Sequence, residues 1–212
     1  MKRILQTFTA ALVVLLGIMG FNAKAAEPVA FDFFEDFDDP THYELGGTLP
    51  DGWVSTGTIP FNRDKGENYG VPAKSGSYVL ATVSSFNSTR DEVAFTPMMK
   101  LAANKECKIS FWVYAPGGTP AIVRNNQFVL RVYDAQSSDA QFVSIGESEK
   151  KAFSEWTQLS FTYTPTVDVE VSFGVNIATS MSSCGTVAID DFEITGFKPE
   201  RQNPTRNRPK TP

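Results

Sequence analysis

The sequence is poor in the residues that most hydrolases need. It contains one histidine, His42, and two cysteines among 212 residues. A Ser-His-Asp hydrolase would depend on that single histidine, and zinc hydrolases use paired histidines, so neither class has support. We therefore expect no catalytic residues. A glycoside hydrolase remains an outside alternative because it needs only two carboxylates, and the chain has many.

The sequence also lacks a sustained helical period after its first residues. An apolar run at Ala10–Met19 follows Lys2 and Arg3 and is followed by the small-residue sequence Ala23–Ala25. The run is too short to span a bilayer comfortably, and its flanks are those of a secretory signal. We predict a signal peptide over residues 1–25, no transmembrane segment after its cleavage, and a product that is secreted, periplasmic or at the cell surface.

Positive charge is scarce as well. The chain has 19 basic and 24 acidic residues, and loss of the three basic residues of the signal would leave a net charge of −8. This balance argues against nucleic acid as a partner. Residues 26–198 show no composition break, which predicts one domain. Residues 199–212 are rich in proline and basic residues, and we expect them to be a disordered tail.

The two cysteines leave two alternatives open. Cys107 and Cys184 would enter a compartment that permits oxidation, so they could form a disulfide between two strands. They could equally be two buried free thiols.

What the sequence does contain is a series of short alternating segments. In 107–114, Ile109, Phe111 and Val113 share one side, and Trp112 and Tyr114 share the other. Similar segments are separated by Gly, Pro, Asn and Ser clusters, which is typical of an all-β, two-sheet antiparallel sandwich. The expected strands are residues 31–39, 76–83, 92–97, 107–114, 127–133, 156–163, 169–177 and 187–195, with residues 54–71 read as a polar loop.

The order of several short motifs resembles that of a known family. The motifs are Glu35-Asp-Phe37, Leu49-Pro-Asp-Gly-Trp53, Gly76-Ser-Tyr-Val-Leu-Ala81, Phe95-Thr-Pro97, Ile109-Ser-Phe-Trp112 and Ile189-Asp-Asp-Phe192. In this order they resemble the choice-of-anchor J or cleaved-adhesin domain of secreted bacterial proteins, and the related jelly-roll modules that bind carbohydrate. The chain departs from the pattern at Val93, where family members commonly have tryptophan. The resemblance implies a jelly roll with a non-enzymatic role in adhesion or glycan binding, often with a structural calcium.

Acidic residues near both ends of the predicted domain suggest where a calcium ion would bind. Glu35, Asp36 and Asp38 lie in the first expected strand, and Asp190 and Asp191 interrupt the last one. Calcium prefers carboxylate and carbonyl oxygens, so these acids could share an ion if the two strands are neighbours. The resemblance adds backbone oxygens of the Lys74–Gly76 loop as helpers. The alternative is that the acids simply face solvent at strand ends.

A second group of residues suggests a carbohydrate-binding face. Flat aromatic rings stack on sugar rings, while arginine and asparagine donate oriented hydrogen bonds. We expect the ligand contacts to come from the non-core sides of three strands, at Trp112, Tyr114, Arg131, Tyr133 and Asn176. The alternative is ordinary packing under a loop. We interpret Trp53 and Trp156 as structural residues at the edges of the sandwich.

Together these observations predict a secreted, non-catalytic binding module with a glycan or cell-surface ligand. A structural or adhesive protein that contacts protein partners is the main alternative.

Overall fold

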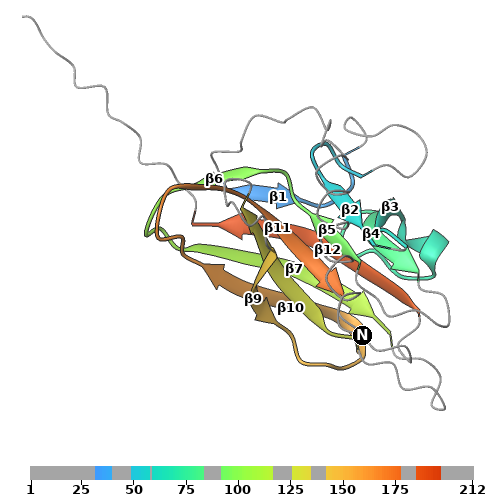
Figure 1. The fold of residues 1–212 in the computed structure, drawn as a ribbon. Coiled ribbons are helices and arrows are strands. Elements are labelled where there is room, and N and C mark those ends of the chain that lie inside the picture. The colour runs from blue at the N-terminus through green and yellow to red at the C-terminus, as the bar shows by residue number, and fades with distance from the viewer. Residues whose placement is uncertain are drawn as a thin grey trace, which may run out of the picture.

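The protein is a β-sandwich in the computed structural model, which describes residues 32–39, 49–57, 59–83, 92–116, 126–134, 142–177 and 185–196. Two antiparallel sheets pack face to face (Figure 1). Among these residues the only helical element is a short 3-10 turn, η2 (Gly66–Tyr69), and no helix is long and apolar enough to cross a membrane. The predicted fold class is therefore confirmed. The predicted signal peptide, the tail and Cys184 lie outside the described residues.

The β7 sheet has the strand order β10-β7-β12-β4-β3, and β1 pairs with β12 beside that path. The second half of β7 alternates between buried and partly exposed residues, as expected of a strand with one side in the core, whereas residues 187–190 of β12 are all buried. Its strands are β1 (Phe33–Glu35), β3 (Asn62–Lys65), β4 (Tyr78–Val83), β7 (Cys107–Ala115), β10 (Phe153–Tyr163) and β12 (Thr186–Thr195).

The β11 sheet has the order β2-β5-β11-β8-β9, and β6 pairs with β11 beside that path. The expected strands agree with the structure to within a few residues, apart from 31–39, of which only 33–35 is a strand. Four short strands were not predicted: β2, β3, β6 and β9. The strands of this sheet are β2 (Val54–Thr56), β5 (Val93–Phe95), β6 (Met99–Leu101), β8 (Phe128–Asp134), β9 (Phe142–Glu147) and β11 (Val169–Ile177).

The core lies between the sheets and is rich in phenylalanine. Phe192 of β12 stacks on Phe111 with ring centroids 5.6 Å apart and meets the edge of Trp53 at 5.4 Å. Trp53 is 5% exposed, as expected for a structural tryptophan. Burial of each such ring contributes about 1.5–3 kcal/mol, so this aromatic cluster is a large part of the folding energy.

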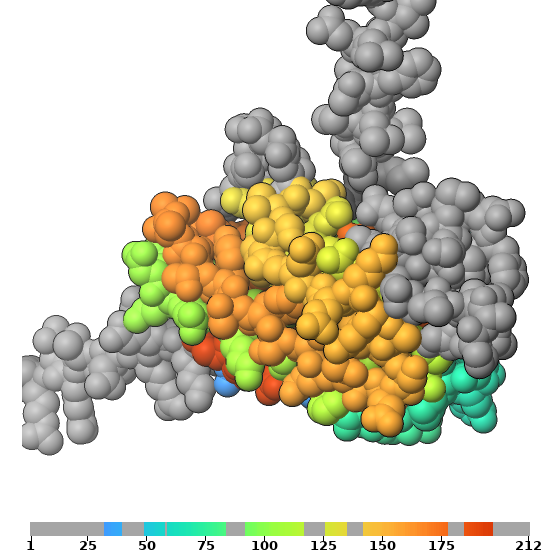
Figure 2. All heavy atoms as spheres, turned by 90° about the horizontal axis from the view of Figure 1, so that it is seen from below, coloured from blue at the N-terminus to red at the C-terminus, as the bar shows by residue number. Residues whose placement is uncertain are grey.

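One edge of the sandwich closes where β9 meets β10. A Cβ atom at Gly146 of β9 would overlap the ring of Phe161 in β10, so this ring packs directly on the backbone of β9 because residue 146 has no side chain. Figure 2 shows this side of the molecule, with the yellow and orange surfaces of β9 and β10 next to each other.

The two ends of the domain are neighbours in the β7 sheet. β1 pairs with β12 in the register Phe33↔Ile194 and Glu35↔Phe192, while β4 pairs with the first half of β12. β1 and β4 thus follow one another along the same side of β12. The short gap between them lies beside a β-bulge in β12, where Asp191 has a φ of 47°. The prediction that the first and last strands are neighbours is confirmed.

Asp38 bridges this gap. Its Oδ1 accepts hydrogen bonds from the backbone N–H groups of Ser77 (2.9 Å) and Tyr78 (3.2 Å), where β4 begins. Gly76 has a φ of 52°, and a Cβ atom there would overlap the Asp38 carboxylate. The close approach of Asp38 to this loop therefore requires glycine at position 76.

We predict that Gly76→Ala lowers the free energy of unfolding by about 2–4 kcal/mol, because it strains the left-handed backbone and expels Asp38 from its two N–H donors. Gly70→Ala is the matched control, since Gly70 also has a positive φ, 68°, but nothing lies within 4 Å of its Cβ position. The free energy of unfolding of the control should fall only by the cost of backbone strain, about 1–2 kcal/mol. Urea denaturation measures both, and equal losses would contradict the assignment.

Candidate functional site

Three of the acidic residues at the domain ends, Asp38, Asp190 and Asp191, bind the loop Lys74–Tyr78. Asp190 is fully buried, and its Oδ2 accepts hydrogen bonds from the backbone N–H groups of Lys74 (2.9 Å) and Ser75 (3.3 Å). Its Oδ1 accepts from the N–H of Asp191 at 2.8 Å. The hydroxyl of Ser75 donates to Asp191 Oδ1 at 2.6 Å. Both aspartates of the last strand therefore hold this loop.

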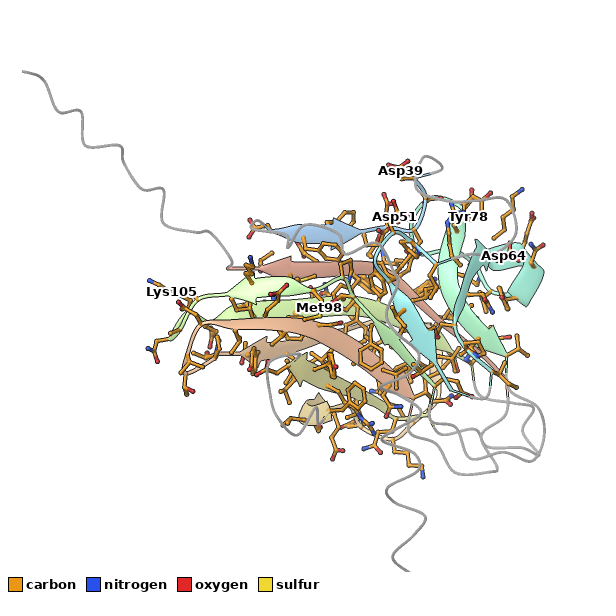
Figure 3. The ribbon with its side chains drawn as sticks, turned by 45° about the horizontal axis from the view of Figure 1, so that its top comes forward. Asp39, Asp51, Asp64, Tyr78, Met98 and Lys105 are labelled. Carbon is orange, nitrogen blue, oxygen red and sulfur yellow. The ribbon has the colours of Figure 1, made fainter. Side chains whose placement is uncertain are left out.

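Glu35 and Asp36 bond within their own turn. Glu35 Oε1 accepts from the N–H of Phe37 at 2.8 Å, and Asp36 Oδ1 accepts from the N–H of Asp38 at 3.0 Å. These bonds shape the turn after β1, where Phe37 has a φ of 61° and its ring is buried in the core. Figure 3 shows Asp39, Asp51 and Asp64 near Tyr78 at one end of the sandwich, with Lys105 at the opposite end.

Burial raises the pKa of Asp190 to about 7, while the backbone N–H groups that it accepts from oppose the shift and the charge of Asp191 adds to it. The loss of hydration therefore outweighs three hydrogen bonds. A cation next to this carboxylate would favour its ionised form.

The donor atoms here suit calcium chemically, because carboxylate and carbonyl oxygens are its preferred ligands. In the part of the chain that is described, however, no three His, Cys, Asp or Glu side chains form a group that could hold a metal ion. An ion at this place would therefore need backbone carbonyl oxygens beside the carboxylates of Asp190 and its neighbours.

The five residues predicted as one binding face lie on opposite sides of the molecule. Trp112 and Tyr114 are on the outer side of the β7 sheet, whereas Arg131, Tyr133 and Asn176 are on the outer side of the β11 sheet. The prediction of a single face is wrong because β7 and β8, although consecutive long strands, belong to different sheets.

Trp112 and Tyr114 have partners on the outer side of their sheet, which come from the covering segment 71–75 and from β10. The ammonium group of Lys74 lies 4.3 Å from the ring centroid of Trp112. The ring of Tyr114 packs against Trp156, whose Nε1 donates to the carbonyl of Pro72 at 3.2 Å. This segment buries a small second core on the outer side of the sheet, formed by Val71, Val79, Ala81 and Ala188. Both aromatic residues thus serve packing here.

Asn176 is also occupied by the fold. Its side chain is fully buried, and its Nδ2 donates to the carbonyl of Glu92 at 3.1 Å, at the start of β5. Cys107 is a buried free thiol whose Sγ donates to the carbonyl of Tyr163 at 3.4 Å. Burial raises the pKa of this thiol to about 11, so it stays protonated and inert.

The more open aromatic group lies on the outer side of the β11 sheet and includes two residues that the sequence analysis missed. Phe142 of β9 is 40% exposed, and its ring lies 5.2 Å from Tyr133 and 5.0 Å from Phe95. Arg131 is two residues before Tyr133 on the same side of β8. We call Phe95, Tyr133 and Phe142 the aromatic patch. The alternation in 142–147 was the signal that could have placed Phe142 on a strand.

The pKa of Asp190 makes stability depend on pH. Its value in the unfolded chain is near 3.8 and in the folded chain about 7, so between these values the folded state holds a proton that the unfolded state has released. The contribution of Asp190 is therefore full below pH 4 and is lost as the pH rises to about 7. We predict that the difference in free energy of unfolding between the wild type and Asp190→Asn falls as the pH rises from about 4 to about 7. Urea denaturation in the presence of EGTA measures this difference. A difference that stays constant with pH would contradict the assignment.

Solved structures share this fold at low sequence identity. The CBM22-1 xylan-binding domain of Xyn10C from Paenibacillus barcinonensis superposes with a TM-score of 0.54 at 14% identity, covering 82% of this chain and all of that one. The K1 cleaved-adhesin domain of Lys-gingipain from Porphyromonas gingivalis W83 gives 0.52 at 15% identity, covering 78% and 98%. The C-terminal family 22 carbohydrate-binding module of Xyn10B from Clostridium thermocellum gives 0.53 at 13% identity, covering 81% and 98%.

These likenesses confirm the jelly-roll fold that the sequence motifs implied, and they include a cleaved-adhesin domain. The more specific choice-of-anchor J label stays a prediction. No curated protein matches the chain. The family model that does match is that of the MAM domain (meprin/A5/mu), over residues 36–198, which include all the described strands except β1. The chain therefore belongs to the MAM domain family.

Proposed function

We propose that this domain is a secreted, non-catalytic module that binds carbohydrate through the aromatic patch. The observation that carries the proposal is the exposed ring of Phe142, flanked by Tyr133 on the outer side of the β11 sheet. An exposed aromatic ring offers an apolar face to the C–H groups of a sugar, and Arg131 beside it can donate hydrogen bonds to sugar oxygens.

The fold gives the proposal indirect support. Two of the similar structures are carbohydrate-binding modules, one of them named for binding xylan. Their identity to this chain is 13–14%, so the ligand of this domain cannot be taken from them. We propose a glycan as the ligand class, and the predicted signal peptide would bring the domain to glycans outside the cell.

We predict that a glycan array identifies ligands, and that Phe142→Ala and Tyr133→Ala each weaken binding about tenfold or more in calorimetry. Two variants serve as controls. Phe34→Ala removes a ring that is 57% exposed on β1 of the other sheet, and Trp112→Ala alters the opposite face. Both should bind like the wild type. Full binding by Phe142→Ala, or loss of binding by Trp112→Ala, would contradict the proposed face.

An adhesive domain that contacts protein is the second candidate. It is favoured by Val143, which is 56% exposed beside Phe142 on β9, an edge strand of the β11 sheet. Exposed apolar edge strands are typical of protein contacts. A domain of this kind would give no signal on the array.

We further propose a structural calcium ion at the Lys74–Tyr78 loop, with Asp190, Asp191, Glu35 and Asp36 as the acidic neighbours. The support is the burial of the Asp190 carboxylate next to Asp191, against a loop whose other end is bonded to Asp38 from the first strand's turn. Such an ion would join the first strand to the last and would compensate the lost hydration of Asp190.

We predict that EGTA lowers the melting temperature and that added calcium restores it, because a ligand that binds only the native state stabilises it by about 2.7 kcal/mol at a hundredfold excess over Kd. In Asp190→Asn the calcium response should disappear. Magnesium is the control ion. If the EGTA-treated wild type melts at the same temperature with and without calcium, the proposed calcium site is wrong.

A further inference from the structure

A glycine in β11 lies beneath the ring of Phe95 on the outer side of the β11 sheet. Gly174 of β11 lies between Phe95 of β5 and Arg131 of β8 in the register of the sheet. A Cβ atom at Gly174 would overlap the Phe95 ring and would lie 2.9 Å from Cγ1 of Val93. The Phe95 ring therefore lies across β11 at a position that has no side chain.

This placement lets Phe95 reach the ring of Phe142, although their strands are separated by β11 and β8. The two rings stack with an angle of 28° between their planes and a centroid distance of 5.0 Å. Because stacked rings attract each other by about 0.5–1.5 kcal/mol beyond their burial, Phe95 holds Phe142 over the sheet. Without this contact, Tyr133 would be the one remaining ring partner of Phe142 among the described residues.

The patch has one open ring. Phe142 is 40% exposed, Phe95 is 6% exposed, and Tyr133 is half-buried. Adhesion to a flat insoluble polysaccharide needs several open rings in one plane, so that neighbouring chains of the solid are contacted together. A single open ring stacks on one sugar residue, with polar groups such as Arg131 beside it.

We infer that Gly174 and Phe95 are positioning residues for Phe142, and that the patch takes one sugar residue of a soluble glycan and not the surface of an insoluble one. This inference rests on the proposed carbohydrate-binding function and names its ligand class and supporting residues.

The positioning role is tested with Gly174→Ala, which forces the Phe95 ring away, and with Phe95→Leu, which removes the stacked ring. A 4-fluorophenylalanine placed at position 142 reports the ring contact through its fluorine resonance. Both variants should shift this resonance and weaken binding of the soluble oligosaccharides found on the array about tenfold. Phe95→Tyr keeps the ring and should leave both unchanged.

Gly146→Ala is the matched control for loss of stability. Its Cβ would overlap the Phe161 ring in the same manner, but on the core side of β9. It should lower the melting temperature while leaving the affinity within about twofold of the wild type, well below the tenfold loss of the other variants. If Gly174→Ala binds normally and keeps the fluorine resonance, or if Gly146→Ala loses affinity equally, the positioning role is overturned.

The ligand class is tested by sedimentation of the wild type with crystalline cellulose and crystalline chitin. The domain should remain in the supernatant, and co-sedimentation would overturn the class. If no soluble or insoluble glycan binds the wild type, the proposed function and the ligand class fail together. The fluorine resonance then still decides whether Gly174 and Phe95 hold Phe142.

Discussion

The pairing of the first strand with the last is the constraint on which this structure depends. β1 is three residues long and could not persist alone, because an isolated short strand buries too little to offset its ordering. Its backbone pairs with β12, and the turn after it holds it in place. In that turn the Phe37 side chain is buried, and the Phe37 backbone carbonyl accepts a hydrogen bond from Arg63 Nε at 2.6 Å. The acids around that turn then bind the loop that begins β4. Three distant parts of the chain thus meet at one place.

The electrostatics of this meeting place explain why carboxylates are tolerated near the core. Asp38 and Asp190 each accept hydrogen bonds from backbone N–H groups of the Lys74–Tyr78 loop, which would otherwise need partners of their own. The acids and the loop therefore satisfy one another. The buried carboxylate of Asp190 still loses hydration, which is the physical reason for considering a cation there.

The sequence was sufficient for the all-β class, the long strands and the neighbouring chain ends, because period-two alternation reports one buried side of a strand directly. It was not sufficient to assign strands to sheets. Trp112 and Tyr133 both alternate away from the core, yet they lie on opposite outer surfaces, since alternation says nothing about which sheet a strand joins. The error in the predicted binding face follows from that limit.

Burial on the outer side of a sheet was the other feature beyond the reach of pattern analysis. Asn176 points away from the core and is nevertheless fully buried, and Trp112 is covered by Lys74, which lies just before the expected strand 76–83. In the opposite direction, Phe142 was overlooked because its strand is only six residues long and a register shift interrupts its pairing with β8. Long-range packing over a sheet surface decides these cases, and it has no local signature.

The antiparallel contact of β1 and β12 has an architectural consequence. Residue 32 precedes Phe33, and Thr195 follows Ile194, so the backbone enters and leaves the fold at nearly one point. A unit whose two ends are adjacent can form a side branch of a longer chain. Such a unit can be placed within a larger polypeptide, or repeated along it, without separating the segments on either side.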